Sequence, residues 1–118
     1  MAPRVSEACS HVLQAIAEID GYVLGLSNDQ VLADQMRMRA IERCVEIISE
    51  AVRHIPDDAR KRHSEIPWRD IEAIGNIMRH GYFHVNADIV LKVARFELEA
   101  LASAVRDISP LNLDGGGG

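Results

Sequence analysis

Five side chains in the segment 66–86 have the types and the spacing that a site of chemistry would need. Arg69, Asn76 and His80 fall at helical spacing and share one face, while Arg79 and Tyr82 flank His80. A histidine can transfer protons near neutral pH, and a place in the last turn of a helix favours its protonated form. An arginine is always charged, and its planar fork can bind two phosphate oxygens at once. A polar helix face that ends at a histidine, a glycine and a tyrosine is unusual, and it makes this segment the candidate site of chemistry.

The helix that would carry these residues has clear start and stop signals. Pro67 suits the first helical position, where its missing N–H removes no hydrogen bond. Gly81 can adopt the left-handed conformation that ends many helices. The buried side of this helix should consist of residues at the same spacing, namely Trp68, Ile71, Gly75 and Met78.

Two helices are expected before this segment. Apolar residues recur every three or four positions over residues 4–24, and Gly25 interrupts the pattern. Ser27 and Gln30 have the spacing of a capping box, so a second helix should begin there. Its apolar pattern continues without Gly or Pro as far as Pro56, which predicts one unbroken helix of about seven turns.

The rest of the chain completes a bundle. A short connecting helix or turn is expected just after Pro56. Asn86 is a good start for a last helix, and Pro110 should end it. Four main helices joined by short connections favour an all-α, up-and-down bundle. We expect a single domain over residues 1–113 and a flexible glycine-rich tail over residues 114–118.

Composition limits the possible functions. The chain has 118 residues, of which 47% are hydrophobic and only 4% aromatic, and this favours one helical core. Its net charge of -5 argues against a general polyanion-binding surface. Cys9 and Cys44 match no metal or redox spacing and are expected to be reduced core thiols. The chain lacks a signal-peptide pattern and a membrane-spanning stretch, so we expect a cytoplasmic protein that does not enter a membrane.

Several apolar residues are expected to lie outside the core of a single bundle. Ile74 and Ile77 point away from the Trp68 face of their helix, and Ile47 and Ile48 point in different directions. A second copy of the chain could cover these residues. This pattern predicts a homodimer.

Several motifs resemble the HepT group of HEPN-domain proteins, the toxins of a bacterial toxin-antitoxin system, over nearly the whole chain. The segment 40–51 is similar to the second-helix signature of that family, with Ser49 where glycine is commoner. The run 65–69 is a close match, and His-Gly-Tyr at 80–82 follows Asn76 at the spacing of the family. No single motif is specific, but their order and spacing together are.

The resemblance implies an all-helical HEPN fold, a dimer, and endoribonuclease activity on RNA without a metal or another cofactor. The catalytic signature of the family is an Arg, then Asn or Asp, then a His five positions after the Arg and a Tyr two positions further on. Asn76, His80 and Tyr82 fit this signature. The resemblance also implies that a nucleotidyltransferase antitoxin silences the nuclease by attaching AMP to Tyr82.

The signature is incomplete, because Gly75 stands where the family has its Arg. Losing one transition-state donor typically lowers a rate by about 100- to 1000-fold. Arg79 is the first candidate for a replacement cation, since it adjoins His80. Arg69 shares the face of His80 but lies roughly 16 Å away along the helix axis, so it could act more easily across a two-fold interface.

Two other interpretations stay open. In one, the chain keeps the HEPN fold and its nucleotidyltransferase partner but has lost catalysis together with the Arg. In the other, it is a plain helical dimerisation protein, and the motif match is accidental. Each residue also has a structural interpretation: His80 as a helix-end histidine, Asn76 as a hydrogen-bonding residue, Tyr82 as a rim aromatic, and residues 60–62 as a solvated turn.

Overall fold

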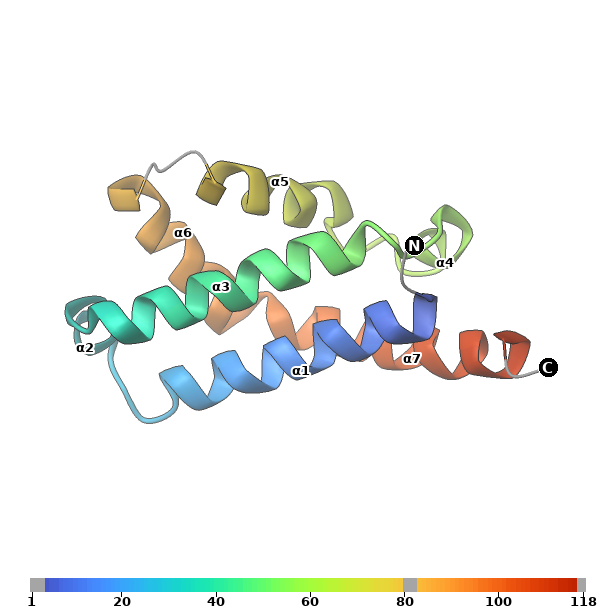
Figure 1. Cartoon of the computed structure of the whole chain (residues 1–118), viewed down its shortest axis with the longest axis horizontal. Helices are drawn as coiled ribbons and strands as arrows, with labels where there is room; N and C mark the ends of the chain where they lie inside the picture. The colour runs from blue at the N-terminus through green and yellow to red at the C-terminus, as the bar shows by residue number, and fades with distance from the viewer. Residues whose placement is uncertain (1–3, 80–82, 117–118) are drawn as a thin grey trace.

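A computed structural model describes the backbone of residues 4–79 and 83–116 and the side chains of residues 4–78 and 87–109. Within these residues the chain forms seven helices and no strand (Figure 1). In order they are α1 (Val5–Val23), α2 (Asn28–Ala33), α3 (Gln35–Val52), α4 (Asp57–Lys61), α5 (Trp68–Arg79), α6 (Phe83–Phe96) and α7 (Leu98–Gly116). The prediction of an all-α bundle is confirmed.

Helix α3 is the central element of the bundle. It lies between α1 and α5 and packs against both, while α7 packs against α1 (Figure 1). The core between these helices is aliphatic, and its largest fully buried side chains include Ile19, Met38, Ile41, Ile48 and Leu101. None of the described helices is both long enough and apolar enough to cross a bilayer.

The predicted second helix is interrupted. The capping box is confirmed, because Gln30 N–H donates to Ser27 Oγ at 3.1 Å and Ser27 N–H donates to Gln30 Oε1 at 2.8 Å. The helix that follows it ends after only six residues, because Asp34 caps a new helix. Its carboxylate accepts from Arg37 N–H at 3.1 Å, and the Arg37 side chain donates to the Tyr22 carbonyl at 2.8 Å. A short polar side chain thus competes with the continuing backbone ladder.

The bounds predicted for the last helix are wrong. Helical backbone begins at Phe83 rather than at Asn86, and it passes Pro110 and continues to Gly116, into the predicted tail over residues 114–118. A proline removes its own N–H from the ladder and crowds the carbonyl four residues earlier, and a helix can pass it with a local distortion.

This last stretch is also divided at Glu97, between α6 and α7. Next to the division, the Arg95 guanidinium donates to Asn28 Oδ1 at 2.6 Å and to the Leu26 carbonyl at 2.5 Å. These bonds tie the end of α6 to the connection between α1 and α2. The division therefore lets α6 and α7 follow different directions while each keeps an apolar side on the core.

Both cysteines are buried free thiols, as predicted. Burial raises the pKa of the Cys9 thiol. Burial, together with the Glu18 carboxylate that accepts a hydrogen bond at 3.5 Å, raises the pKa of Cys44 to about 11. Because the thiolate is the reactive form, neither cysteine is suited to chemistry at neutral pH.

Most of the apolar residues expected outside the core lie within it or against it. Ile48 is only 2% exposed, and Ile47 and Ile74 are half-buried and pack on the core. Ile77 on α5 is the member of this group that stays exposed, at 39%. The first three residues therefore do not require a second chain, and of these four residues Ile77 alone still favours one.

Candidate functional site

Helix α5 carries the described part of the candidate site. It begins one residue after Pro67, whose carbonyl accepts from Ile71 N–H at 3.1 Å and closes the first turn. Trp68, Ile71 and Gly75 are buried, as predicted, whereas Asn76 is exposed. The helix runs along α3 in the opposite direction (Figure 1).

The five candidate residues are distributed along the whole of α5 and beyond it. Arg69 is exposed in the first turn, and Asn76 is exposed in the second half. Arg79 is the last residue of the helix, and its side chain lies outside the described residues, as do His80 and Tyr82 entirely. At 1.5 Å per residue, Arg69 is about 15 Å from Arg79 along the axis. The structure therefore separates Arg69 from the end of the helix that precedes His80.

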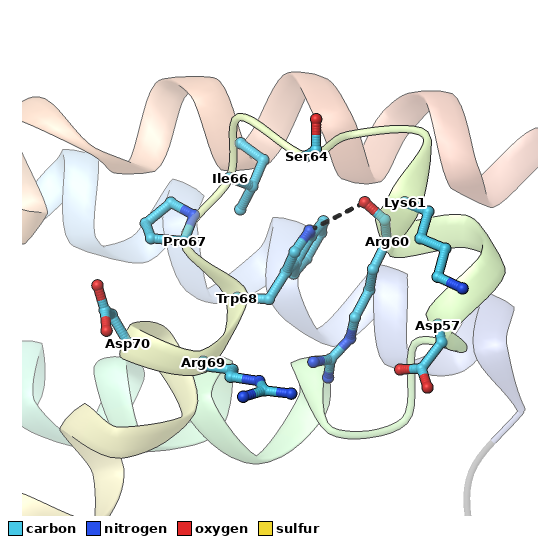
Figure 2. A pocket seen from close by; sticks show the side chains of 9 residues that line it. All are labelled: Asp57, Arg60, Lys61, Ser64, Ile66, Pro67, Trp68, Arg69 and Asp70. Atoms are coloured by element: carbon cyan, nitrogen blue, oxygen red, sulfur yellow. Dashed lines mark hydrogen bonds between the residues drawn. The ribbon is translucent and has the colours of Figure 1, made fainter.

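Arg69 instead lines a surface pocket of about 520 Å3 at the start of α5 (Figure 2). Lys61 adds a second positive charge to this pocket, and Asp57 and Asp70 add two negative charges. None of these four residues forms an ion pair with another described residue. Arg60 also lines the pocket, but its charge is paired with Glu72. The other four charges balance, so this pocket does not have the cationic excess of a strong phosphate site.

Arg60, at the back of the pocket, has a structural role. Its guanidinium donates to the carbonyls of Ile55, at 3.0 Å, and Val52, and it forms an ion pair with Glu72 at 2.7 Å. It also lies over the Trp68 ring, 5.6 Å from the ring centroid. Its side chain is only 14% exposed, so the interpretation of a solvated turn is wrong for this residue. Arg60 joins the end of α3 to α4 and α5.

We expect Arg60→Ala to lower the free energy of unfolding by about 2 kcal/mol, because it leaves the Glu72 carboxylate and the carbonyls of Val52 and Ile55 without their donor. Arg62→Ala is the matched control, since Arg62 is exposed and should change stability by less than about 0.5 kcal/mol. Urea unfolding followed by circular dichroism measures both values. Equal stability of the two variants would contradict the structural role of Arg60.

Gly75, which stands where the family signature has its Arg, lies at the contact between α3 and α5. A Cβ atom added at Gly75 would lie 2.8 Å from Ser49 Cβ and would press even closer against Ser49 Oγ. Ser49 is 2% exposed, and its hydroxyl donates to the Glu72 carbonyl at 2.8 Å. The two positions at which the chain departs from the resembled pattern, Ser49 and Gly75, therefore touch each other.

Glu42 is a candidate that the sequence pattern did not single out. It lies two turns before Ser49 on the same face of α3, and because α3 and α5 are antiparallel, this is the direction of the C-terminal end of α5 (Figure 1). Burial raises the pKa of its carboxyl group, and Glu46 raises it further, against the opposing effect of Arg39. A carboxyl group with a raised pKa is suited to proton transfer. Glu42 is seven residues before Ser49, which puts both on one face of α3. This spacing points to Glu42 only when Ser49 is known to face α5, as the structure shows.

The relatives of the chain are assigned as ribonucleases. A protein of Caldanaerobacter subterraneus assigned as an RNase is 34% identical over 98 residues, which cover 83% of this chain and 88% of the relative. A protein of Thermococcus cleftensis assigned as ribonuclease HepT is 30% identical over 90 residues, which cover 76% and 82%. A protein of Methanocaldococcus jannaschii assigned as an RNase is 25% identical over 101 residues, which cover 82% and 84%. No solved structure matches the chain.

The family model described as "Ribonuclease HepT-like" matches residues 12–108. This range includes α3, α5 and the whole signature from Gly75 to Tyr82. It leaves out only short stretches at the two ends of the chain. The chain belongs to the HepT-like ribonuclease family.

Proposed function

We propose that this protein is a metal-independent endoribonuclease whose site lies at the C-terminal end of α5. The observation that carries the proposal is the family match over residues 12–108, which contains Asn76, His80 and Tyr82 in the order of the signature. In the proposed reaction the ribose 2′-oxygen bonds to the adjacent phosphorus, and the 5′-oxygen leaves. His80 transfers the proton that moves from the attacking oxygen to the leaving oxygen. Asn76, four residues earlier, orients the phosphate or His80.

An arginine is proposed to balance the charge on the phosphate. Arg79 is the first candidate, because the α5 backbone leads through it directly into His80. Arg69 is the second, and its distance along the axis means that it would have to come from a second protomer. Gly75 cannot take this role.

Incubation of RNA with the purified protein in excess EDTA tests the activity. Cleavage is expected to proceed in EDTA, because no step uses a metal ion. RNA that stays intact at high protein concentration would contradict the proposal.

A second function is favoured by one observation, the contact between Gly75 and Ser49. This contact leaves no side chain at the position where the family signature has its cation. The chain would then be a helical interaction module that binds the nucleotidyltransferase partner but does not cleave RNA. An active wild type would exclude this function.

We also propose that the protein is a homodimer in which α5 faces its symmetry mate. Ile77 is 39% exposed and adjoins Asn76, so the same contact would bring the two sites together. Ile77→Glu should therefore convert the dimer to a monomer, because two buried charges would oppose each other across the interface. Mass measured in solution over a dilution series tests this prediction. Leu24→Glu, at the end of α1 and 81% exposed, is the control and should remain dimeric. A monomeric wild type at micromolar concentration would contradict the proposal.

The proposed biological setting is a cytoplasmic toxin-antitoxin pair. The buried free thiols of Cys9 and Cys44 suit a reducing compartment. The proposed antitoxin is a nucleotidyltransferase that joins AMP from ATP to the Tyr82 oxygen and releases pyrophosphate. A bulky anionic group beside His80 would obstruct and repel RNA.

Mass spectrometry tests this modification after incubation with the nucleotidyltransferase and ATP. The mass of the chain should increase by one AMP, and RNA cleavage should fall to background. Tyr82→Phe should block both effects, while Tyr22→Phe, which changes the other tyrosine of the chain, should block neither. AMP attached to any other residue would contradict the role of Tyr82.

A further inference from the structure

Ser49 is an unusual residue in the core of this bundle. It is the only buried polar or charged side chain among the described residues, at 2% exposed. Its hydroxyl donates to the Glu72 carbonyl of α5 at 2.8 Å. In the α-helix, the same carbonyl also accepts the N–H of the residue four positions later, which is Asn76. The Ser49 hydroxyl and the backbone N–H of the candidate residue Asn76 therefore share one acceptor, the Glu72 carbonyl.

Gly75 completes this contact from the other helix. A Cβ atom at Gly75 would come within 2.8 Å of Ser49 Cβ, a distance that real Cβ contacts essentially never show. The glycine therefore lets α5 lie closer to α3 at this level than any other residue would allow. The Ser49 hydroxyl and Gly75 together set the position of α5 against α3.

Both the backbone carbonyl and the side-chain carboxylate of Glu72 are bonded to other helices. Its carbonyl accepts from Ser49, and its carboxylate is paired with Arg60 at 2.7 Å. These two anchors lie on different sides of the same residue, so they restrict both the rotation and the translation of α5. Asn76 follows one turn later, and the backbone reaches Arg79 after three more residues.

We infer that Ser49 is a positioning residue for the proposed ribonuclease site, and that it acts through the Glu72 carbonyl and the close contact with Gly75. The inference rests on the proposed function. The hydroxyl fixes the height and rotation of the second half of α5, which carries Asn76 and leads into His80. A displacement of about 1 Å at a catalytic group can cost about 100-fold in rate, so a small shift of α5 is sufficient to affect the reaction.

The test compares four variants at a temperature at which circular dichroism shows each to be folded. Ser49→Ala removes the hydroxyl and should lower kcat about tenfold with KM unchanged. Gly75→Ala forces the helices apart and should lower kcat about 100-fold. In Ser49→Gly/Gly75→Ala the collision is relieved but the hydroxyl is still absent, so kcat should rise about tenfold above that of Gly75→Ala, to the level of Ser49→Ala. Gly21→Ala is the matched control, since a Cβ at Gly21 meets no atom within 4 Å, and its kcat should equal that of the wild type.

Amide hydrogen exchange gives a second readout that does not depend on activity. Ser49→Ala should speed exchange at residues 76–79 about tenfold, and α1 should not change. If the wild type does not cleave RNA, the proposed function fails, and the exchange rates still decide whether Ser49 holds this part of α5. Unchanged kcat in Ser49→Ala, or no recovery in the double variant, would overturn the positioning role. Unchanged exchange at residues 76–79 would overturn it as well.

Discussion

Gly75→Arg should lower the free energy of unfolding by about 3 kcal/mol, although it restores the residue that the family signature has at this position. The reason is steric, because even the first side-chain atom would collide with Ser49. The collision forces α5 away from α3 and strains the bond between Ser49 and the Glu72 carbonyl. Thermal unfolding should show a midpoint lower by about 10 °C.

The double variant Ser49→Gly/Gly75→Arg should be more stable than the sum of its single changes predicts. Ser49→Gly costs about 2 kcal/mol by itself, through a lost hydrogen bond and lower helix propensity. It also removes both atoms with which a side chain at position 75 collides. Interacting residues of this kind show coupling energies of about 0.5–3 kcal/mol in a double-mutant cycle. Additive effects would contradict the direct contact between the two positions.

The same double variant separates the two proposed functions. If the wild type is a nuclease that uses Arg79 or Arg69, it cleaves RNA without any change at position 75. If the chain has lost catalysis with the signature Arg, only Ser49→Gly/Gly75→Arg should cleave. Gly75→Arg alone is a poor test of lost catalysis, because it disturbs the helix packing at the same time.

The main helices could be predicted from the sequence because their apolar periodicity is a local property. The first helix was predicted for residues 4–24 and is found at Val5–Val23, with Gly25 at φ +73 after its end. The divisions at Asp34 and Glu97 could not be predicted in the same way. Arg37 reaches the Tyr22 carbonyl beside the first division, and Arg95 reaches a connection 67 residues away in sequence beside the second. Such contacts exist only after the helices have packed.

The candidate site shows the same limit. The exposure of Asn76 and the burial of Gly75 follow from helical spacing, and both were predicted. The contact of Gly75 with Ser49 was not predicted. It joins two helices, and the apolar pattern of each helix does not say how far one is shifted along the other. The structural role of Arg60 was missed for a similar reason, since a run of three basic residues resembles a solvated turn until its Glu72 and Trp68 partners are known.

His80→Ala should have the largest effect on activity of any single change. Removing a general acid-base catalyst typically lowers a rate by about 100- to 10,000-fold, and we expect about 1000-fold here. We expect the fold of this variant to be unchanged, and circular dichroism checks this. His11→Ala is the matched control, since His11 is an exposed histidine on α1, which lies on the far side of α3 from α5 (Figure 1).

The most direct measurement of the central claim is the single-turnover rate of RNA cleavage in EDTA for the wild type, His80→Ala and His11→Ala. The proposed site predicts cleavage by the wild type and by His11→Ala at the same rate, and a loss of about 1000-fold in His80→Ala. Equal rates for His80→Ala and the wild type would contradict a nuclease site at the end of α5.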